Sequence, residues 1–130
     1  MNVAWARVWV AAGGLFGFAA VAMSAIAAHA LPQRLDARGL HAVESAVQMQ
    51  GWHALALLAT ALLVERRLAP RWSNLAGGAF LLGVLLFSGS IYLGELAGLR
   101  FGPTAPMGGI LLMSGWLLLA GGAVFGGRAP

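Results

Sequence analysis

The stretch VWVAAGGLFGFAAVAMSAIAAHAL, residues 8–31, contains no charged side chain and is bordered by Arg7 and Arg34. A helix of about 20 apolar residues is long enough to cross the hydrocarbon core of a bilayer. Three more charge-free stretches follow along the chain, and we expect membrane spans over residues 8–31, 47–64, 72–93 and 105–125. This pattern predicts an all-α protein, an integral membrane four-helix bundle, whose solvent is the bilayer.

The composition predicts a single membrane domain over residues 1–130. Hydrophobic residues make up 60% of the chain and charged residues 9%, whereas a soluble domain has about 25% charged residues. The net charge of +4 comes from arginine alone, and arginines at span ends act as topology signals and headgroup anchors. We therefore expect no nucleic-acid partner. The chain has no cysteine, which excludes disulfides, thiolate nucleophiles and cysteine-ligated metals.

The connecting segments determine the expected topology. Residues 33–48 are polar and contain no proline, so we expect a short interfacial helix between spans one and two. Four spans place both termini on one side of the membrane, together with five arginines against three on the other side. Because short cytoplasmic loops carry the arginine excess, we expect both termini in the cytoplasm.

Polar residues within the spans gather near one end of the expected bundle. The topology places the end of span one, the start of span two, the end of span three and the start of span four in the extracytoplasmic leaflet. Polar side chains are costly in lipid and usually face the bundle interior. We therefore expect one polar cluster there, made of His29, Gln50, His53, Ser88, Ser90, Tyr92, Glu95, Thr104, Pro106 and Gly108.

Two interpretations of this cluster are open. Its members can hydrogen-bond across helices and hold the bundle together, or they can form a site for a ligand, an ion or a proton. His29, His53 and Glu95 are residue types that bind Zn, Fe or Mn, but their spacing matches no metal-binding signature. The chain has no nucleophile elbow, phosphate loop or dinucleotide fingerprint. We expect no enzymatic activity, no metal and no cofactor.

Small residues and tryptophans predict how the spans pack. Glycines spaced by four residues, such as Gly13 and Gly17, allow helix backbones to approach closely. They indicate packing within the chain, and the alternative is a face for self-association. Trp5 and Trp9 flank Arg7, which is typical of indole rings in the headgroup region.

Five short motifs occur along the chain, and the first four overlap the polar cluster: AHAL at 28–31, QGWHALALL at 50–58, FSGSIY at 87–92, TAPMGG at 104–109 and GW at 115–116. In this order along the chain, they resemble the motifs of the domain-of-unknown-function 423 family of small bacterial inner-membrane proteins, which have small mitochondrial membrane relatives in eukaryotes. Two departures from the family pattern are Ser24–Ala27, where the family usually has glycines, and Met49, where it tends to have tyrosine. The resemblance implies a four-helix bacterial inner-membrane protein of unassigned activity.

These observations lead to an expected role in the membrane without catalysis. We expect a small oligomer, or an accessory subunit of a membrane complex, that contacts lipid and other membrane-embedded chains. The small extramembrane mass favours this role, because partners would have to bind mainly within the bilayer. The alternative is a small proton or solute channel or transporter lined by the polar cluster. Four short helices enclose little volume, so transport would require oligomerisation.

Overall fold

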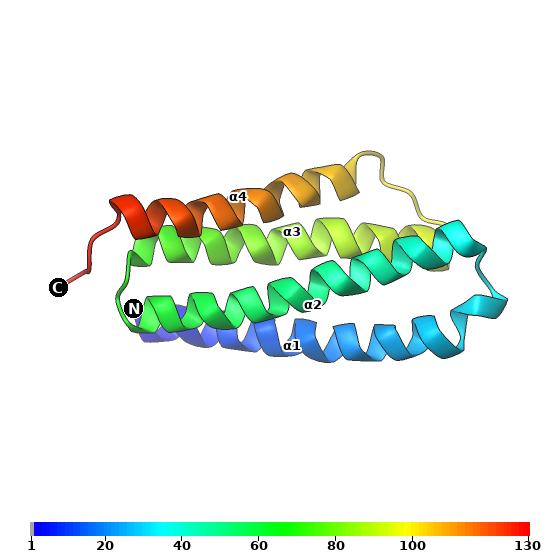
Figure 1. Ribbon diagram of the computed structural model, residues 1–130, viewed down its shortest axis with the longest axis horizontal. Helices are drawn as coiled ribbons and strands as arrows, with labels where there is room; N and C mark the ends of the chain where they lie inside the picture. Colours follow the sequence, from blue (N-terminus) through cyan, green and yellow to red (C-terminus); the bar gives the residue numbers. More distant parts are fainter. Residues whose placement is uncertain (1) are drawn as a thin grey trace.

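A computed structural model describes residues 2–130 as four long helices that run up and down side by side (Figure 1). All four helices are long and apolar enough to cross a membrane, which confirms the predicted all-α membrane fold. Both ends of the chain lie at the same end of the bundle (Figure 1), called here the terminal end, and the opposite end is called the connector end. The helices are α1 (Asn2–His29), α2 (Ala37–Glu65), α3 (Pro70–Ala97) and α4 (Thr104–Phe125), with a 3₁₀ turn, η1 (Leu31–Gln33), between α1 and α2.

The connector between α1 and α2 consists of the turn η1 and the residues that lead into the start of α2. Only the short turn η1 separates the two long helices, and α2 then runs without interruption from Ala37 to Glu65. The Asp36 side chain caps the start of α2 by accepting a hydrogen bond from the Gly39 amide at 2.8 Å. Because no proline follows until Pro70, nothing breaks the helix between the polar connector and the apolar span. The polar residues over which an interfacial helix was expected therefore form the first part of α2, and their position at the membrane interface stays a prediction.

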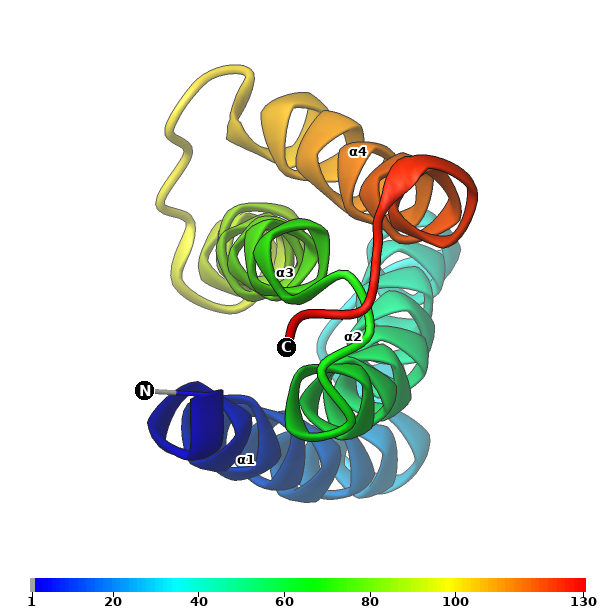
Figure 2. The ribbon, with the colours of Figure 1, turned by 90° about the vertical axis from the view of Figure 1, so that its left-hand side faces the viewer.

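The helices pack in the order in which they occur in the chain. α1 packs on α2, α2 on α3, and α3 on α4, whereas α1 and α3 touch only slightly. Seen from the terminal end, α1 and α4 lie on opposite edges of the molecule (Figure 2). The buried residues Leu57, Val64 and Phe80 form the centre of the main apolar core. The arrangement leaves much of α1 and α4 open to the surrounding lipid.

Several glycines permit the close approach of neighbouring helices. A Cβ atom on Gly13 would lie 2.9 Å from the Ala54 carbonyl oxygen of α2, and one on Gly108 would overlap the backbone nitrogen of Phe87 in α3. A Cβ on Gly122 would likewise lie 2.7 Å from the Cβ of Trp72. These positions therefore serve packing within the chain.

Trp9 packs inside the bundle and does not face its surroundings, unlike the exposed indole that its place near Arg7 suggested. Its side chain is only 4% exposed, and its indole nitrogen donates a hydrogen bond to Oδ1 of Asn74 in α3 at 2.8 Å. The ring lies directly over Gly77, where a Cβ would come within 2.6 Å of it. Trp5, which is 45% exposed, stacks on Trp9 with ring centroids 5.6 Å apart. The indole of Trp9 thus joins α1 to α3, two helices that otherwise make little contact.

Candidate functional site

Gln50 is the polar residue that joins the largest number of helices. It lies in α2, is 4% exposed, and donates from its side-chain nitrogen to the Phe16 carbonyl oxygen of α1 at 2.9 Å. Its side-chain oxygen accepts a hydrogen bond from the Tyr92 hydroxyl of α3 at 2.8 Å. One side chain therefore connects three helices, with its donor and its acceptor ends both in use.

His53 lies one turn further along α2 and has partners on both ring nitrogens. Its Nδ1 lies 2.6 Å from the Met49 carbonyl oxygen, and its Nε2 lies 3.0 Å from the indole nitrogen of Trp116 in α4. An indole nitrogen can only donate, so the Nε2 atom accepts and the proton resides on Nδ1, which donates to Met49. This arrangement requires a neutral imidazole and leaves neither ring nitrogen free for a metal or a proton.

Aromatic contacts surround the same imidazole. The His53 ring centroid lies 5.4 Å from that of Phe80 and 5.9 Å from that of Trp116, and the latter two lie 5.2 Å apart. Such tilted and edge-to-face arrangements are the favourable ones for aromatic rings. The three rings come from α2, α3 and α4, so they connect α4 to α2 even though α4 packs mainly along α3.

The two serines of the FSGSIY motif behave differently. Ser88 is 1% exposed and donates to the Ala46 carbonyl oxygen of α2 at 2.8 Å. Ser90 donates to the carbonyl oxygen of Phe87, in its own helix, at 3.0 Å. Ser88 therefore links α3 to α2 by a hydrogen bond, whereas the hydroxyl of Ser90 bonds only within its own helix.

The remaining residues of the expected cluster lie apart from this network. His29 is exposed at the end of α1, and it makes no side-chain hydrogen bond within residues 2–130. Glu95, at the connector end of α3, lies 3.5 Å from the guanidinium of Arg100. Thr104 and Pro106 lie in the first turn of α4. Gly108, which is buried, serves the α3–α4 contact described above.

Glu95 instead borders a polar hollow at the connector end of the bundle. The hollow has a volume of about 490 Å³ and is lined by the charged side chains of Asp36, Arg38, Glu95 and Arg100. Glu95 also approaches the first turn of α2, where its Oε2 atom lies 2.8 Å from the place of a Cβ on Gly39. A carboxylate there interacts favourably with the positive end of the helix dipole. The two acidic and two basic side chains that line this hollow therefore balance each other in charge.

The described part of the chain has the hydrogen-bonding pattern of a structural network. Within residues 2–130, every buried side-chain nitrogen and oxygen atom has a hydrogen-bond partner. No three His, Cys, Asp or Glu side chains in this range converge in a way that would hold a metal ion. The geometry favours connection between helices over the binding of an ion or a substrate.

Sequence reasoning missed several partners in this network. Trp116 was noted only as part of a family motif. It donates a hydrogen bond to His53, which is 63 residues away in the sequence, so only the fold shows that the two side chains meet. The acceptors at Phe16, Met49 and Ala46 are backbone carbonyls, which have no signal in the sequence. Asn74, the partner of Trp9, could have been identified from the sequence, because an amide side chain in an apolar span is costly unless it is hydrogen-bonded.

Comparison with known proteins identifies related chains. A family model described as a protein of unknown function (DUF423) matches residues 23–109. A UPF0382 membrane protein of Haemophilus influenzae is 38% identical over 110 residues, which cover 84% of this chain and 87% of the relative. The UPF0382 inner membrane protein YgdD of Escherichia coli K12 is 34% identical over 109 residues, which cover 83% of this chain and 82% of the relative.

A relative from a third organism extends these matches. A UPF0382 membrane protein of Staphylococcus saprophyticus is 34% identical over 115 residues, which cover 87% of this chain and 93% of the relative. No solved structure matches the chain. The region matched by the family model contains Gln50, His53, Ser88 and Tyr92 but ends before Trp116.

Proposed function

Because this chain belongs to the DUF423 family of membrane proteins, whose function is unknown, we propose a role from its own side chains. The protein acts without catalysis, as a small oligomer or as an accessory subunit of a membrane complex. Its buried polar residues hold its helices together, and its outer surface binds other membrane-embedded chains.

The observation that carries this proposal is the saturation of the polar network. The side chains of Gln50, His53 and Tyr92 are hydrogen-bonded to groups of this same chain. A channel or a proton relay needs polar groups that exchange partners with the permeant, and a metal enzyme needs free ligand atoms. The network supports a structural use of the cluster over either of these alternatives.

The outer surface supports a partner within the bilayer. α1 and α4 lie on opposite edges of the molecule (Figure 2), and large apolar side chains on both are exposed, including Phe18 at 76% and Leu117 at 73%. The segments outside the four long helices are short, the longest connection being the seven residues 30–36 between α1 and α2. Such a chain offers little surface for a soluble partner and two apolar helix faces for a membrane-embedded one.

We place the protein in the bacterial inner membrane with both termini in the cytoplasm. Relatives carry the name inner membrane protein. Arg7, Arg66, Arg67, Arg71 and Arg128 lie on the side of the termini, against three arginines on the other side. The cytoplasmic side is the one that carries such an excess. A reporter fused to the N-terminus that labels only from outside the cell would contradict this orientation.

The decisive experiment is native mass spectrometry of the protein after mild extraction at its natural expression level. We expect a defined homo-oligomer or reproducible copurification with a larger membrane complex. The variant Tyr92→Phe, which removes one donor of the network, is expected to lower thermal stability without changing the set of partners. A monomer that conducts protons or a solute in liposomes, and loses that flux in Tyr92→Phe, would overturn the proposal.

A further inference from the structure

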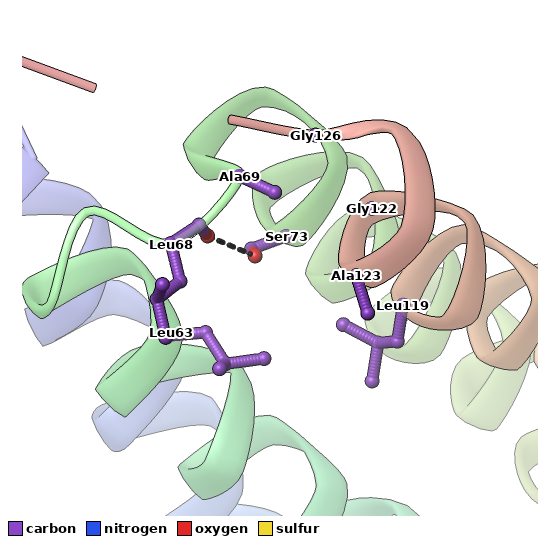
Figure 3. Close-up of a pocket in the computed structure, with 8 residues that line it drawn as sticks. All are labelled: Leu63, Leu68, Ala69, Ser73, Leu119, Gly122, Ala123 and Gly126. Atoms are coloured by element: carbon purple, nitrogen blue, oxygen red, sulfur yellow. Dashed lines mark hydrogen bonds between the residues drawn. The ribbon is translucent and has the colours of Figure 1, made fainter. Parts of the chain in front are cut away.

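An apolar cavity opens between α2 and α4 at the terminal end of the bundle. It has a volume of about 240 Å³, and Figure 3 shows its lining side chains. The cavity exists because α4 packs along α3 and not along α2, with Gly122 seated against Trp72. Its lining comes from the end of α2, the turn after it, the start of α3 and the end of α4, and includes Leu63, Leu68, Ser73, Leu119, Gly122 and Ala123.

The chemistry of this cavity fits hydrocarbon. Its one side-chain hydroxyl, that of Ser73, already donates to the Leu68 carbonyl oxygen at 3.0 Å (Figure 3). Apolar cavities of about 150 Å³ in proteins remain free of water and accept small hydrocarbons such as benzene. In a bilayer, the hydrocarbon available to this cavity is a lipid acyl chain.

Arginines lie close in the chain to the residues that line the cavity. Arg66 and Arg67 lie in the turn between α2 and α3, and Arg71 lies in the first turn of α3. The C-terminal tail brings Arg128 to the same end of the bundle. The tail is fixed there by an antiparallel bridge between Leu68 and Arg128, and the Ala69 amide donates to the Gly127 carbonyl oxygen at 3.2 Å.

Three of these guanidinium groups are available to an anionic ligand, whereas that of Arg67 donates a hydrogen bond to the Pro130 carbonyl oxygen. Arg66, Arg71 and Arg128 are exposed, and within residues 2–130 the single ion pair is the one between Arg100 and Glu95 at the other end of the molecule. The nearest acidic residue in the sequence is Glu65. A guanidinium group presents paired N–H donors that match the oxygens of a phosphate group.

We propose that this end of the protein binds one anionic phospholipid. One acyl chain of the lipid occupies the cavity between α2 and α4, and its phosphate is held by Arg66, Arg71 and Arg128. Basic pockets between membrane helices on the cytoplasmic side bind anionic lipid headgroups in this way. The site is independent of the polar network around Gln50 and His53.

The test uses the full chain in a mild detergent, with native mass spectrometry to count retained lipid. The probes are dioleoyl-phosphatidylglycerol, which is anionic, and dioleoyl-phosphatidylcholine, which has the same chains and no net charge. We expect one phosphatidylglycerol to be retained, with an apparent affinity at least about tenfold above that for phosphatidylcholine. Equal retention of the two lipids would overturn the proposal.

Two sets of variants separate this site from general attraction to charge. Arg66→Gln with Arg71→Gln is expected to weaken phosphatidylglycerol retention about tenfold. The matched control is Arg34→Gln with Arg38→Gln, which removes the same charge from the connector end and is expected to leave retention unchanged. An equal loss in both double variants would show that binding follows net charge and would refute the site.

Filling the cavity tests the position of the acyl chain. Ala123→Phe places a ring in the cavity without touching the arginines, and it is expected to reduce phosphatidylglycerol retention about as much as the loss of two arginines. Unchanged retention in this variant would refute the position of the chain. Soluble glycerol 3-phosphate, which has the charge but no chain, should not compete; competition at equal concentration would show a phosphate site and not a lipid site.

Discussion

Replacing Trp116 by Phe removes one hydrogen-bond donor and keeps an aromatic ring next to His53 and Phe80. The lost interaction is the 3.0 Å bond from the indole nitrogen to Nε2 of His53. Hydrogen bonds between membrane helices contribute about 0.6 kcal/mol on average, and a buried acceptor left without a partner adds about 1–3 kcal/mol. Because His53 is only 3% exposed, water cannot replace the indole.

We therefore expect Trp116→Phe to lower the free energy of unfolding by about 1–2 kcal/mol. This corresponds to a decrease in Tm of about 4–8 °C for a chain of this size. The measurement is thermal unfolding of the purified protein in one mild detergent, followed by circular dichroism.

Trp52→Phe is the matched control for this experiment. Trp52 lies next to His53 in the sequence and is 54% exposed, close to the 49% of Trp116, but it makes no side-chain hydrogen bond within the described residues. The same change of side chain should shift Tm there by no more than the small amount typical of surface substitutions. Equal shifts in the two variants would refute the reasoning that the indole of Trp116 is a structural donor.

Two further predictions concern helix contacts. Gly77→Ala would place a Cβ 2.6 Å from the Trp9 ring and should destabilise the protein by about 1–3 kcal/mol. The control is Gly78→Ala, whose Cβ would have no atom within 4 Å, and it should leave Tm unchanged or raise it. Equal Tm values in the two variants would contradict the contact between Gly77 and Trp9. Gly108→Ala would force the start of α4 away from the Phe87 backbone. It should lower the free energy of unfolding by about 3 kcal/mol or more, because a backbone cannot move aside as a side chain does. A Tm within 2 °C of that of the parent protein would show that α3 and α4 separate easily.

The number and type of helices could be predicted from the sequence because the bilayer imposes simple rules. Charge-free stretches of sufficient length must be helices in lipid, where unpaired backbone groups are too costly. The ends were less predictable, since headgroups solvate charged residues and do not terminate a helix. α1 includes Arg7 and α3 includes Glu95 for this reason.

The candidate site was predictable in outline and not in its pairings. The cost of polar groups in lipid identifies Gln50 and His53 as residues that need partners, but their partners lie on other helices and include backbone carbonyls. Trp9 shows the same limit. Its position beside Arg7 suggested the headgroup region, whereas the absence of a side chain at Gly77 makes room for the ring inside the bundle.

The packing of each helix on its neighbour in the chain has a consequence for biogenesis. No main interface has to wait for a distant segment, because α1–α2, α2–α3 and α3–α4 each join consecutive helices. Chains rich in local contacts fold fast, since little loop entropy is lost before contacts form. Each hairpin can therefore assemble as soon as its second helix leaves the ribosome and enters the membrane.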